Sequence, residues 1–394
     1  MAIILFDGNA HQTLLPLTFT RPVANLRVGI LTIAEKWSKY LGQDFSYHTQ
    51  PYLSAKYPVK IEAENLFING AVCPDEQLLE AIDKLRTGET LKREGLLIAV
   101  KLPEGDAENF SPETQYGNII DYSGSPEIIH FPEDIFRKND IELRKDYKLI
   151  TNGRSSASLS ATNTIIGNDF FAEEGAIADC STFNTTNGPI YLDKKTEVWE
   201  GTHIRGAFAL HSYSQVKMGT KIYGATTIGP YCRVGGEINN AVIWGYSSKG
   251  HEGYLGNAVV GEWCNIGADS NNSNLKNNYA EVKLWDYTTQ HFRKTGLQFC
   301  GLIMADHSKC AINTMFNTGT IVGVSANIFG AGFPRNFIPD FSWGGAHGYE
   351  EYSLKRMFET TEKVFARRDH RVFDETEQNI LKTVFDLTEP FRRF

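Results

Sequence analysis

The hydrophobic positions of the N-terminal region follow the short rhythms of an α/β protein. Compact apolar runs at residues 2–6 and 96–100 predict buried strands. Between them, residues 24–42 carry apolar side chains every three or four positions, which predicts an amphipathic helix with Gly42 as its C-cap. Residues 132–150 predict another helix that runs into extended chain.

A six-residue period replaces these rhythms in the middle of the chain. Such a period fits neither an α-helix nor a sheet of ordinary strands, and is typical of a parallel β-helix built from hexapeptide repeats. Each aliphatic side chain then points into the lumen, and three hexads form one coil of about 18 residues. The period runs unbroken through Leu192, Val198, Ile204, Leu210, Val216, Ile222, Ile228 and Val234.

The period is interrupted twice. It slips by two residues within 235–253 and disappears over residues 269–300, which we expect to form a loop leaving the wall. Around these interruptions the inward positions are expected at Tyr254, Val260, Ile266, Ile303, Met315 and Ile321.

Toward the end of the chain the pattern changes again: apolar residues fall at helical spacing among side chains of mixed charge. An open β-helix end needs a cover, so these helices are expected to cap it or to pack on a neighbouring subunit. The sequence therefore predicts three parts: an α/β domain at 1–155, a β-helix at 156–345 and a helical segment at 346–394.

Charge and cysteine content limit the classes of partner and the cellular compartment that we expect for this protein. A formal net charge of −8 argues against nucleic acid or an anionic membrane as the main partner. The six cysteines lie far apart without a CxxC pair, which suits free thiols in a reducing compartment. The apolar run before Asp7 is too short for a signal-peptide core, and no run reaches membrane-spanning length. We expect a cytoplasmic protein that binds small molecules.

A glycine-flanked histidine, His251, opens the most distinctive motif. The stretch SSKGHEGYLGNAVVGEWCNIGADSNNSN (247–274) resembles the acetyltransferase half of the bifunctional N-acetylglucosamine-1-phosphate uridyltransferase/glucosamine-1-phosphate acetyltransferase family. The resemblance implies a left-handed β-helix, acetyl-CoA or another acyl-CoA as co-substrate, and His251 as the general base. Histidine suits this role because the pKa of a free imidazole lies near neutrality.

The same resemblance implies further site residues. Tyr254 and Asn265 occupy positions that contact the sugar or the base, and a backbone N–H near Ala268 faces the thioester oxyanion. The family's two phosphate-binding cations align with Lys221 and Asn239, and its Asn-Tyr pair aligns with Asn274 and Leu275.

One phosphate-binding cation is thus replaced by a neutral amide. Phosphate binding is expected to be weaker or to use other cations, with Arg233, Lys249 or Lys276 as candidates. An amino sugar phosphate and a sugar nucleotide are both open as acceptors.

The front of the chain resembles the sugar nucleotidyltransferases. The element PLTFTRP (16–22) matches their P-L-T motif, and the loop GNAHQT (8–13) keeps the first glycine but lacks the second glycine and the arginine. A glycine-poor loop brings fewer backbone N–H groups to a triphosphate. The resemblance implies nucleotide-binding roles for Gly8, Pro16, Thr18 and Arg21, with Mg²⁺ required only if this domain is active.

Three functions remain open from the sequence. The first is an acyltransferase acting on an amino sugar phosphate or sugar nucleotide. The second is a sugar-1-phosphate nucleotidyltransferase with a degenerate loop, and the third is a non-catalytic trimer that binds a sugar nucleotide. The resemblance implies a homotrimer. No metal site is predicted, because the candidate ligands show no recognisable ligand spacing: His291, His307, His347, Asp306 and Cys310.

Overall fold

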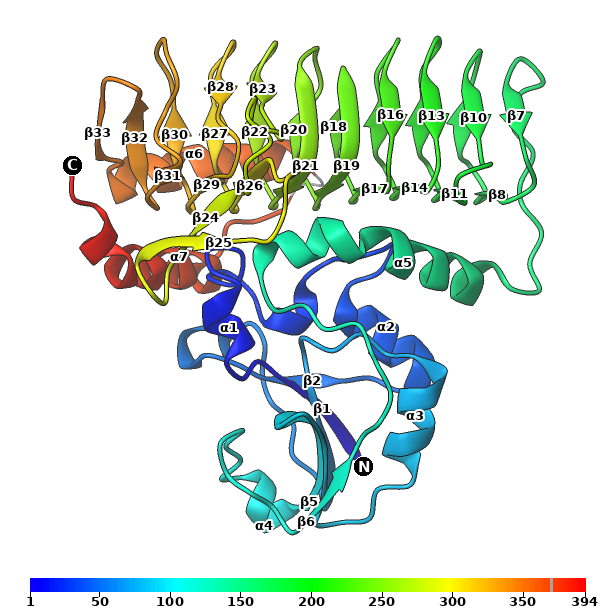
Figure 1. Ribbon diagram of the computed structural model, residues 1–394, viewed down its shortest axis with the longest axis vertical. Coiled ribbons are helices and arrows are strands. Elements are labelled where there is room, and N and C mark those ends of the chain that lie inside the picture. The colour runs from blue at the N-terminus through cyan, green and yellow to red at the C-terminus, as the bar shows by residue number, and fades with distance from the viewer. Residues whose placement is uncertain (369–370) are drawn as a thin grey trace. The chain divides into compact units, whose positions relative to one another are not determined.

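A computed structural model describes residues 1–368 and 371–394 and divides the chain into two compact units (Figure 1). Unit 1 comprises residues 1–27 and 31–131, and unit 2 comprises residues 28–30 and 132–394. The boundary lies earlier than the predicted one near 155, because α5 (Pro132–Thr151) is helical throughout and contacts β17, β19 and β21 of unit 2. Within the described ranges, no helix combines the length and the apolarity needed to cross a membrane.

Unit 1 is built around a six-stranded sheet in the order β2-β1-β3-β5-β4-β6. Strands β1, β2 and β3 are parallel, β5 is antiparallel to both β3 and β4, and β6 is parallel to β4. The two predicted strands are confirmed as β1 and β5. The bounds are β1 Ala2–Phe6, β2 Ser46–His48, β3 Glu64–Asn69, β4 Glu89–Arg93, β5 Leu96–Pro103 and β6 Asn118–Asp121.

The helix predicted over 24–42 is half the expected length. Helix α2 covers Ile33–Leu41 and begins after Thr32, which forms a reciprocal capping box with Glu35. It ends at Gly42, whose φ of +64° confirms the predicted C-cap. The apolar residues before α2 belong to a 3₁₀ turn and to extended chain. Because these residues are buried as well, their spacing in the sequence is similar to that of an amphipathic helix. The other short elements are α1 Ala10–Thr13, α3 Glu76–Asp83, α4 Glu104–Ala107 and the 3₁₀ turns Val23–Asn25 and Pro51–Leu53.

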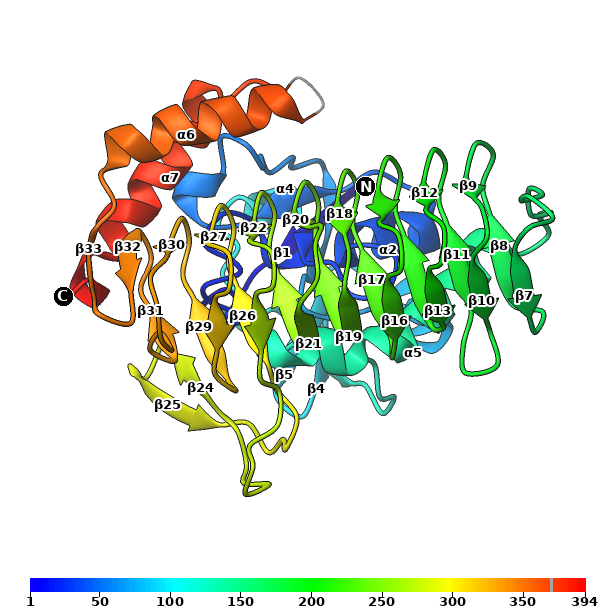
Figure 2. The same ribbon diagram turned by 90° about the horizontal axis from the view of Figure 1, so that it is seen from above.

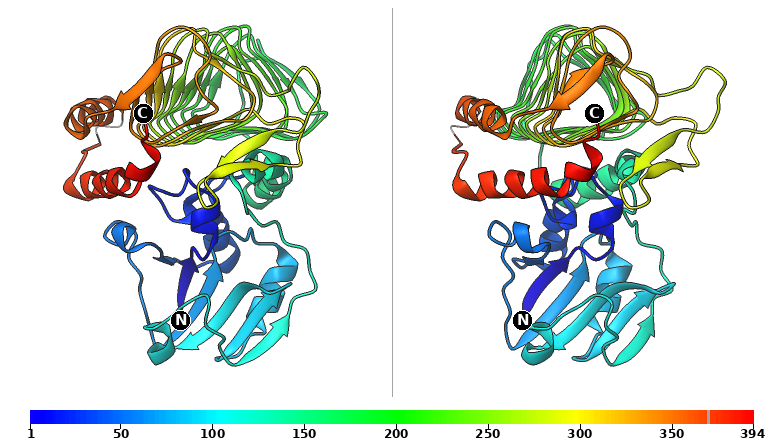
Figure 3. Two further views of the ribbon diagram at one scale, coloured as in Figure 1. Left: turned by 60° about the vertical axis from the view of Figure 1, so that its left-hand side comes forward. Right: turned by 90° about the vertical axis from the view of Figure 1, so that its left-hand side faces the viewer.

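Unit 2 contains a parallel β-solenoid with three walls, which confirms the predicted left-handed β-helix (Figures 1 and 3). The first wall contains β7 Thr164–Ile166, β10 Thr182–Asn184, β13 His203–Arg205, β16 Lys221–Tyr223, the first halves of β19 Glu237–Ile243 and β21 Tyr254–Val260, β23 Asn271–Asn272 and β28 Met315–Phe316. The second wall contains β8 Phe170–Ala172, β11 Ile190–Leu192, β14 Phe208–Leu210, β17 Thr226–Ile228, the second halves of β19 and β21, β26 Leu302–Met304, β29 Thr320–Val322 and β31 Phe337–Ile338. The third wall contains β9 Ile177–Ala178, β12 Glu197–Val198, β15 Gln215–Val216, β18 Arg233–Val234, β20 Ser248–Lys249, β22 Asn265–Ile266, β27 Lys309–Cys310, β30 Asn327–Ile328 and β32 Ser342–Gly345.

The unbroken six-residue period identifies the residues that face the lumen, as predicted. All eight aliphatic residues from Leu192 to Val234 are buried in the solenoid core, each with at most 2% of its surface exposed. Facing residues of successive coils therefore stack on one another, and burying this apolar column is the main stabilisation of the solenoid.

The slip after Val234 is a shortening of the coil and not the predicted insertion. The next inward residues are Ile238 and Ile243, four and five positions on, because β19 runs through a corner without a separate turn. Asn240 forms that corner with φ +49°, and Asn257 does the same in β21 with φ +46°. Asparagine tolerates the left-handed conformation better than most residues.

Of the later inward positions, Val260 and Ile266 are confirmed, whereas the other four were predicted one residue away from their true places; Val322, for example, points inward where Ile321 was expected. Leu255 points into the lumen where Tyr254 was expected, and Met304 and Phe316 do so where Ile303 and Met315 were expected. A shift of one residue moves a strand side chain to the opposite face. The prediction failed here because Ile303 is also fully buried, so the sequence shows apolar residues on both faces.

The predicted loop leaves the wall after β23 and returns before β26. It carries an antiparallel hairpin of β24 (Lys283–Asp286) and β25 (His291–Lys294). Strand β33 (Gly348–Glu351) pairs with the last strand of the third wall, and the predicted C-terminal helices follow as α6 (Leu354–Arg367) and α7 (Glu375–Leu387), then the turn Glu389–Phe391. Helix α6 lies alongside the solenoid (Figure 2).

Candidate functional site

A row of polar side chains crosses the outer face of the third wall. Arg233, Ser248, Asn265 and Lys309 are paired in register from one parallel strand to the next. Parallel register places adjacent side chains of the row about 4.8 Å apart, so residues from four separate coils form one continuous row. Their successors in the sequence point into the lumen, because strand side chains alternate between faces.

An aromatic ladder holds α6 beside this row. The rings of Tyr213, Tyr231, Tyr246 and Trp263 stack along one corner of the solenoid, with centroids 4.2–5.2 Å apart. Phe365 of α6 stacks on Trp263 at 4.0 Å, and the ring of His307 stacks on Phe365 at 6.0 Å. All four corner residues have φ near +60°, so each coil presents its ring in the same direction. The ladder therefore fixes the position of α6 over the third wall.

The wall and α6 enclose a groove of about 550 Å³. Among the residues that the structure describes, its lining contains no aspartate or glutamate, and we call it the cationic groove. It is lined by Lys217, Arg233, Tyr246, Ser248, Gly250, His251, Trp263, Cys264, Asn265, Lys309, Val364, Arg367 and Arg368.

The cations of the groove are held close together by neutral groups. The guanidinium of Arg233 donates to the carbonyls of Tyr213 and Cys232, and that of Arg368 donates to the carbonyl of Tyr231. Burial lowers the pKa of both guanidinium groups, and for Arg368 the charge of Arg233 lowers it further. Burial also lowers the pKa of Lys309 to about 8. Crowded, desolvated cations disfavour their own charge, so a bound anion would relieve this cost.

His251 lies in a turn at the rim of the cationic groove. Its side chain is exposed, and no hydrogen bond joins its ring to another described residue. The turn requires glycine: Gly253 has φ +112°, and a Cβ on it would lie 2.2 Å from the carbonyl oxygen of Ser270. The backbone thus presents the imidazole toward the groove, with its nitrogens available for proton transfer.

Lys249 supports this turn from inside the solenoid. It occupies a lumen position in the third wall and is 2% exposed. Its Nζ donates to the carbonyl of Gly235 at 2.9 Å and to the carbonyl of His251 at 2.8 Å. The sequence pointed to Lys249 as a candidate for the phosphate grip, whereas its ammonium group faces two backbone carbonyls.

Three of the predicted substrate-binding residues meet on the first wall. The Tyr254 hydroxyl accepts hydrogen bonds from the amides of Asn274 (3.0 Å) and Asn239 (3.4 Å). Lys221 lies on the same wall, two strands from Tyr254 in register through Glu237. The two amides form a polar cluster around the Tyr254 phenol, and none of these residues lines the cationic groove.

The remaining implied residues of the solenoid fall in different surroundings. Asn265 lines the cationic groove and is exposed. Ala268 lies in the next turn, where its carbonyl accepts from the amide of Asn313 at 2.8 Å. The predicted set is therefore divided between the groove, the first wall and the lumen of one chain.

In unit 1 the implied nucleotide-binding residues lie in one compact segment after β1. Gly8 turns the chain with φ +51°, and Thr18 donates its hydroxyl to the carbonyl of His11 at 2.6 Å. Arg21 is buried, and Pro16 follows a cis peptide bond. The carboxylate of Asp7 accepts from the amide of Val23, closing the segment on itself.

Sequence reasoning missed the cations that α6 and two coils bring to His251: Lys217, Lys309, Arg367 and Arg368. The pair Arg367-Arg368 ends a helix in the sequence, but nothing local connects it to residue 251. In the described part of the chain, no group of three or more histidine, cysteine or acidic side chains is arranged to hold a metal ion.

Comparison with known proteins identifies the N-terminal segment. Residues 3–155 match the family described as sugar nucleotidyl transferase, which confirms the resemblance for this segment and identifies the chain as a transferase. None of the curated proteins matches the chain.

The solenoid is similar to solved structures only at a distance. One is the UDP-N-acetylglucosamine acyltransferase of Francisella novicida, with 11% identity, a TM-score of 0.34, and coverage of 58% of this chain and 90% of that one. Another is a hexapeptide transferase family protein from Anaplasma phagocytophilum, with 12% identity, a TM-score of 0.24, and coverage of 57% and 96%. Similarity this low carries no argument about activity.

Proposed function

We propose that this transferase, whose N-terminal segment is of the sugar nucleotidyl transferase family, uses its solenoid to transfer an acyl group from acyl-CoA to an amino sugar that carries phosphate. The acceptor is an amino sugar phosphate or a sugar nucleotide. The observation that carries the proposal is the cationic groove, in which a histidine with an available ring stands beside five lysine and arginine side chains. The described part of the lining holds no carboxylate.

The groove suits a phosphorylated acceptor. Arg233 and Arg368 supply guanidinium groups that match phosphate oxygens in paired hydrogen bonds, and Lys309 adds a third charge on the wall. Binding the phosphate would place the rest of the sugar toward the rim, where His251 lies. Asn265, next to Lys309 in the wall, is available to orient the acceptor by hydrogen bonding.

Acyl transfer then requires one base. The acceptor nitrogen attacks the thioester carbonyl, so a C–N bond forms while the C–S bond breaks. His251 takes the proton released from the nitrogen, and the CoA thiolate leaves and recovers a proton. Lys249 acts as a positioning residue, because it holds the carbonyl of His251 from inside the lumen. The resemblance places Tyr254 at the sugar or the base and an N–H near Ala268 at the oxyanion. It aligns Lys221 and Asn239 with the phosphate-binding cations and Asn274 with the asparagine of the Asn-Tyr pair, and it implies a homotrimer.

The test is release of free CoA thiol from acetyl-CoA across a panel of amino sugar phosphates and UDP-amino sugars. We expect turnover with at least one acceptor, lost by at least about 100-fold in kcat for His251→Asn. His347→Asn, an exposed histidine outside the groove, is the matched control and should retain full activity. Arg233→Gln should raise KM for the acceptor more than it lowers kcat. A silent panel, or an active His251→Asn variant, refutes the proposal.

Sugar nucleotidyl transfer is the second candidate, favoured by the family match of residues 3–155. It predicts pyrophosphate release from a nucleoside triphosphate, a sugar 1-phosphate and Mg²⁺, and this activity should survive His251→Asn. Stabilisation by a sugar nucleotide without turnover of any kind would instead indicate the non-catalytic alternative. Light scattering on the purified protein measures whether it is a trimer.

A further inference from the structure

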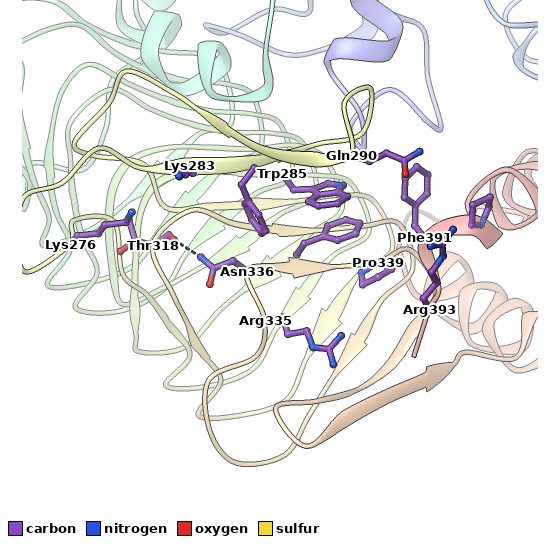
Figure 4. A pocket seen from close by; sticks show the side chains of 13 residues that line it. Lys276, Lys283, Trp285, Gln290, Thr318, Arg335, Asn336, Pro339, Phe391 and Arg393 are labelled. Carbon is purple, nitrogen blue, oxygen red and sulfur yellow. Dashed lines mark hydrogen bonds between the residues drawn. The ribbon is translucent and has the colours of Figure 1, made fainter.

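A second cavity of unit 2 combines aromatic rings with cations. It encloses about 900 Å³ between the hairpin β24–β25, the last coil of the second wall and the C-terminal turn (Figure 4). Of its described lining residues, none is acidic and none belongs to the cationic groove. We call it the hairpin pocket.

The rings form a continuous aromatic surface. Trp285 of the hairpin stacks on Phe337 of β31, with centroids 4.3 Å apart and planes within 11°. Phe292 meets the edge of Trp285 at 5.4 Å, and Phe391 meets Phe337 at 6.4 Å. Phe292 is 43% exposed, an unusual exposure for a phenylalanine that lines a cavity. A planar ligand could stack on this surface and remove it from water.

Four cations surround the aromatic surface: Lys276, Lys283, Arg335 and Arg393. Within the described chain none of them makes an ion pair, and Lys276 donates to the backbone carbonyl of Glu281. This is notable in a protein with a net charge of −8. Like charges gathered without carboxylates raise the local potential and favour a ligand with more than one negative charge.

An amide adds a directional contact. The Nδ2 of Asn336 donates to the carbonyl of Thr318 at 2.7 Å, the contact that is dashed in Figure 4. This bond orients the amide, so that its Oδ1 is available to accept from a ligand N–H or O–H.

We propose that the hairpin pocket binds an aromatic base joined to a diphosphate. The base stacks on the surface of Phe292 and Trp285, and the diphosphate binds Arg335 and Arg393, whose guanidinium groups match phosphate oxygens. A bare anion would not use the rings, and an apolar ligand would not use the cations. The volume lies within the range of small-molecule sites. This proposal does not depend on acyl transfer, and loss of that activity would leave it intact.

Two sources supply this chemistry, a free or sugar-linked nucleoside diphosphate and the adenosine diphosphate part of coenzyme A. Titration calorimetry on the full chain with UDP, ADP, coenzyme A, inorganic pyrophosphate and uridine distinguishes them. We expect at least one of UDP, ADP and coenzyme A to bind the full chain. Pyrophosphate and uridine should each bind with an affinity about 10-fold or more lower, since each lacks one half of the ligand. Binding of UDP or ADP identifies a nucleotide site, and binding of coenzyme A alone identifies a coenzyme A site.

Variants locate the binding. Phe292→Ala and Arg335→Ala should each raise Kd about 10-fold, as expected for a lost stacking or charge-assisted contact. Lys283→Ala should weaken binding, whereas Lys294→Ala is the matched control, because the two lysines face each other across the hairpin and only Lys283 lines the pocket. Thermal unfolding of each variant checks that it is folded.

Three results would overturn the proposal. One is the absence of binding by UDP, ADP and coenzyme A up to about 1 mM, the weak end of specific affinity. Another is pyrophosphate binding as tightly as the nucleotides with no effect of Phe292→Ala, which indicates a simple anion site. The third is binding that Arg233→Gln in the cationic groove removes while Arg335→Ala leaves it unchanged.

Discussion

Lys249 gives the sharpest test of the solenoid interior, because a lysine occupies a position that other coils fill with apolar side chains. In the neighbouring coils of the third wall the same place holds Val234 and Ile266. Lys249→Met keeps the length and the apolar stem of the side chain and removes the charge. It also removes the donor to the carbonyls of Gly235 and His251.

The expected effect depends on pH in a definite direction. Burial lowers the pKa of Lys249 from its ordinary value of 10.5 to about 8, and the more distant Glu252 and Asp269 oppose this only in part. Between these two values the unfolded chain still holds the proton that the folded chain has released. The free energy of unfolding of the native protein therefore rises with pH in this window. The two pKa values together correspond to about 3 kcal/mol, of which none is gained below pH 8 and all is gained above pH 10.5.

The assay is urea unfolding of the native protein and of Lys249→Met at several pH values from 7 to 11. Groups that the charge of Lys249 does not reach titrate equally in both proteins, so the difference in unfolding free energy reports on Lys249 and on Cys310, whose thiol pKa this charge lowers. We expect this difference to shift in favour of the native protein by about 3 kcal/mol between pH 8 and pH 10.5. At pH 7 the variant should be at least as stable as the native protein, because an apolar side chain replaces a desolvated charge. A difference that stays constant with pH would refute the reasoning and show that Lys249 titrates as it does in water.

Three further predictions concern packing, and unfolding free energies or hydrogen exchange check them. Val216→Ala should cost about 2 kcal/mol by opening a cavity in the lumen, whereas Met218→Ala, at a 63% exposed residue, should cost little; equal costs would contradict the inward assignment. Arg293→Ala should cost about 3 kcal/mol of unfolding free energy, because Glu133 is 2% exposed and accepts two hydrogen bonds from this guanidinium. The double variant with Glu133→Gln should recover part of the loss. No recovery would mean that the buried charge is not the cause. Trp263→Ala should speed amide exchange in α6 by removing the ring on which Phe365 stacks, whereas Tyr213→Ala at the far end of the ladder should not; equal exchange in both variants would show that the ladder does not hold the helix.

Repetition made the solenoid readable from the sequence. From Leu192 to Val234 each inward residue meets an equivalent residue of the next coil, so a local period reports a long-range structure. The reading failed where that rule changes. Single-residue corners at Asn240 and Asn257 shorten two coils, and buried residues on both faces near Ile303 hide the true register.

The motif around His251 was also visible in the sequence, because its glycines and the residues that follow are contiguous. Its surroundings were not. Arg233, Lys309 and Arg368 reach the cationic groove from two coils and a helix, and only the register of parallel strands and the stacking of Phe365 on Trp263 bring them together. Nor does the alternation of residues reveal that Lys249 points inward, because that direction depends on which neighbour in the chain faces the lumen. The repeating wall and the histidine motif are thus properties of local sequence. The charges that face the histidine are a property of the packed molecule, since side chains far apart in the chain become neighbours only when coils and helix pack.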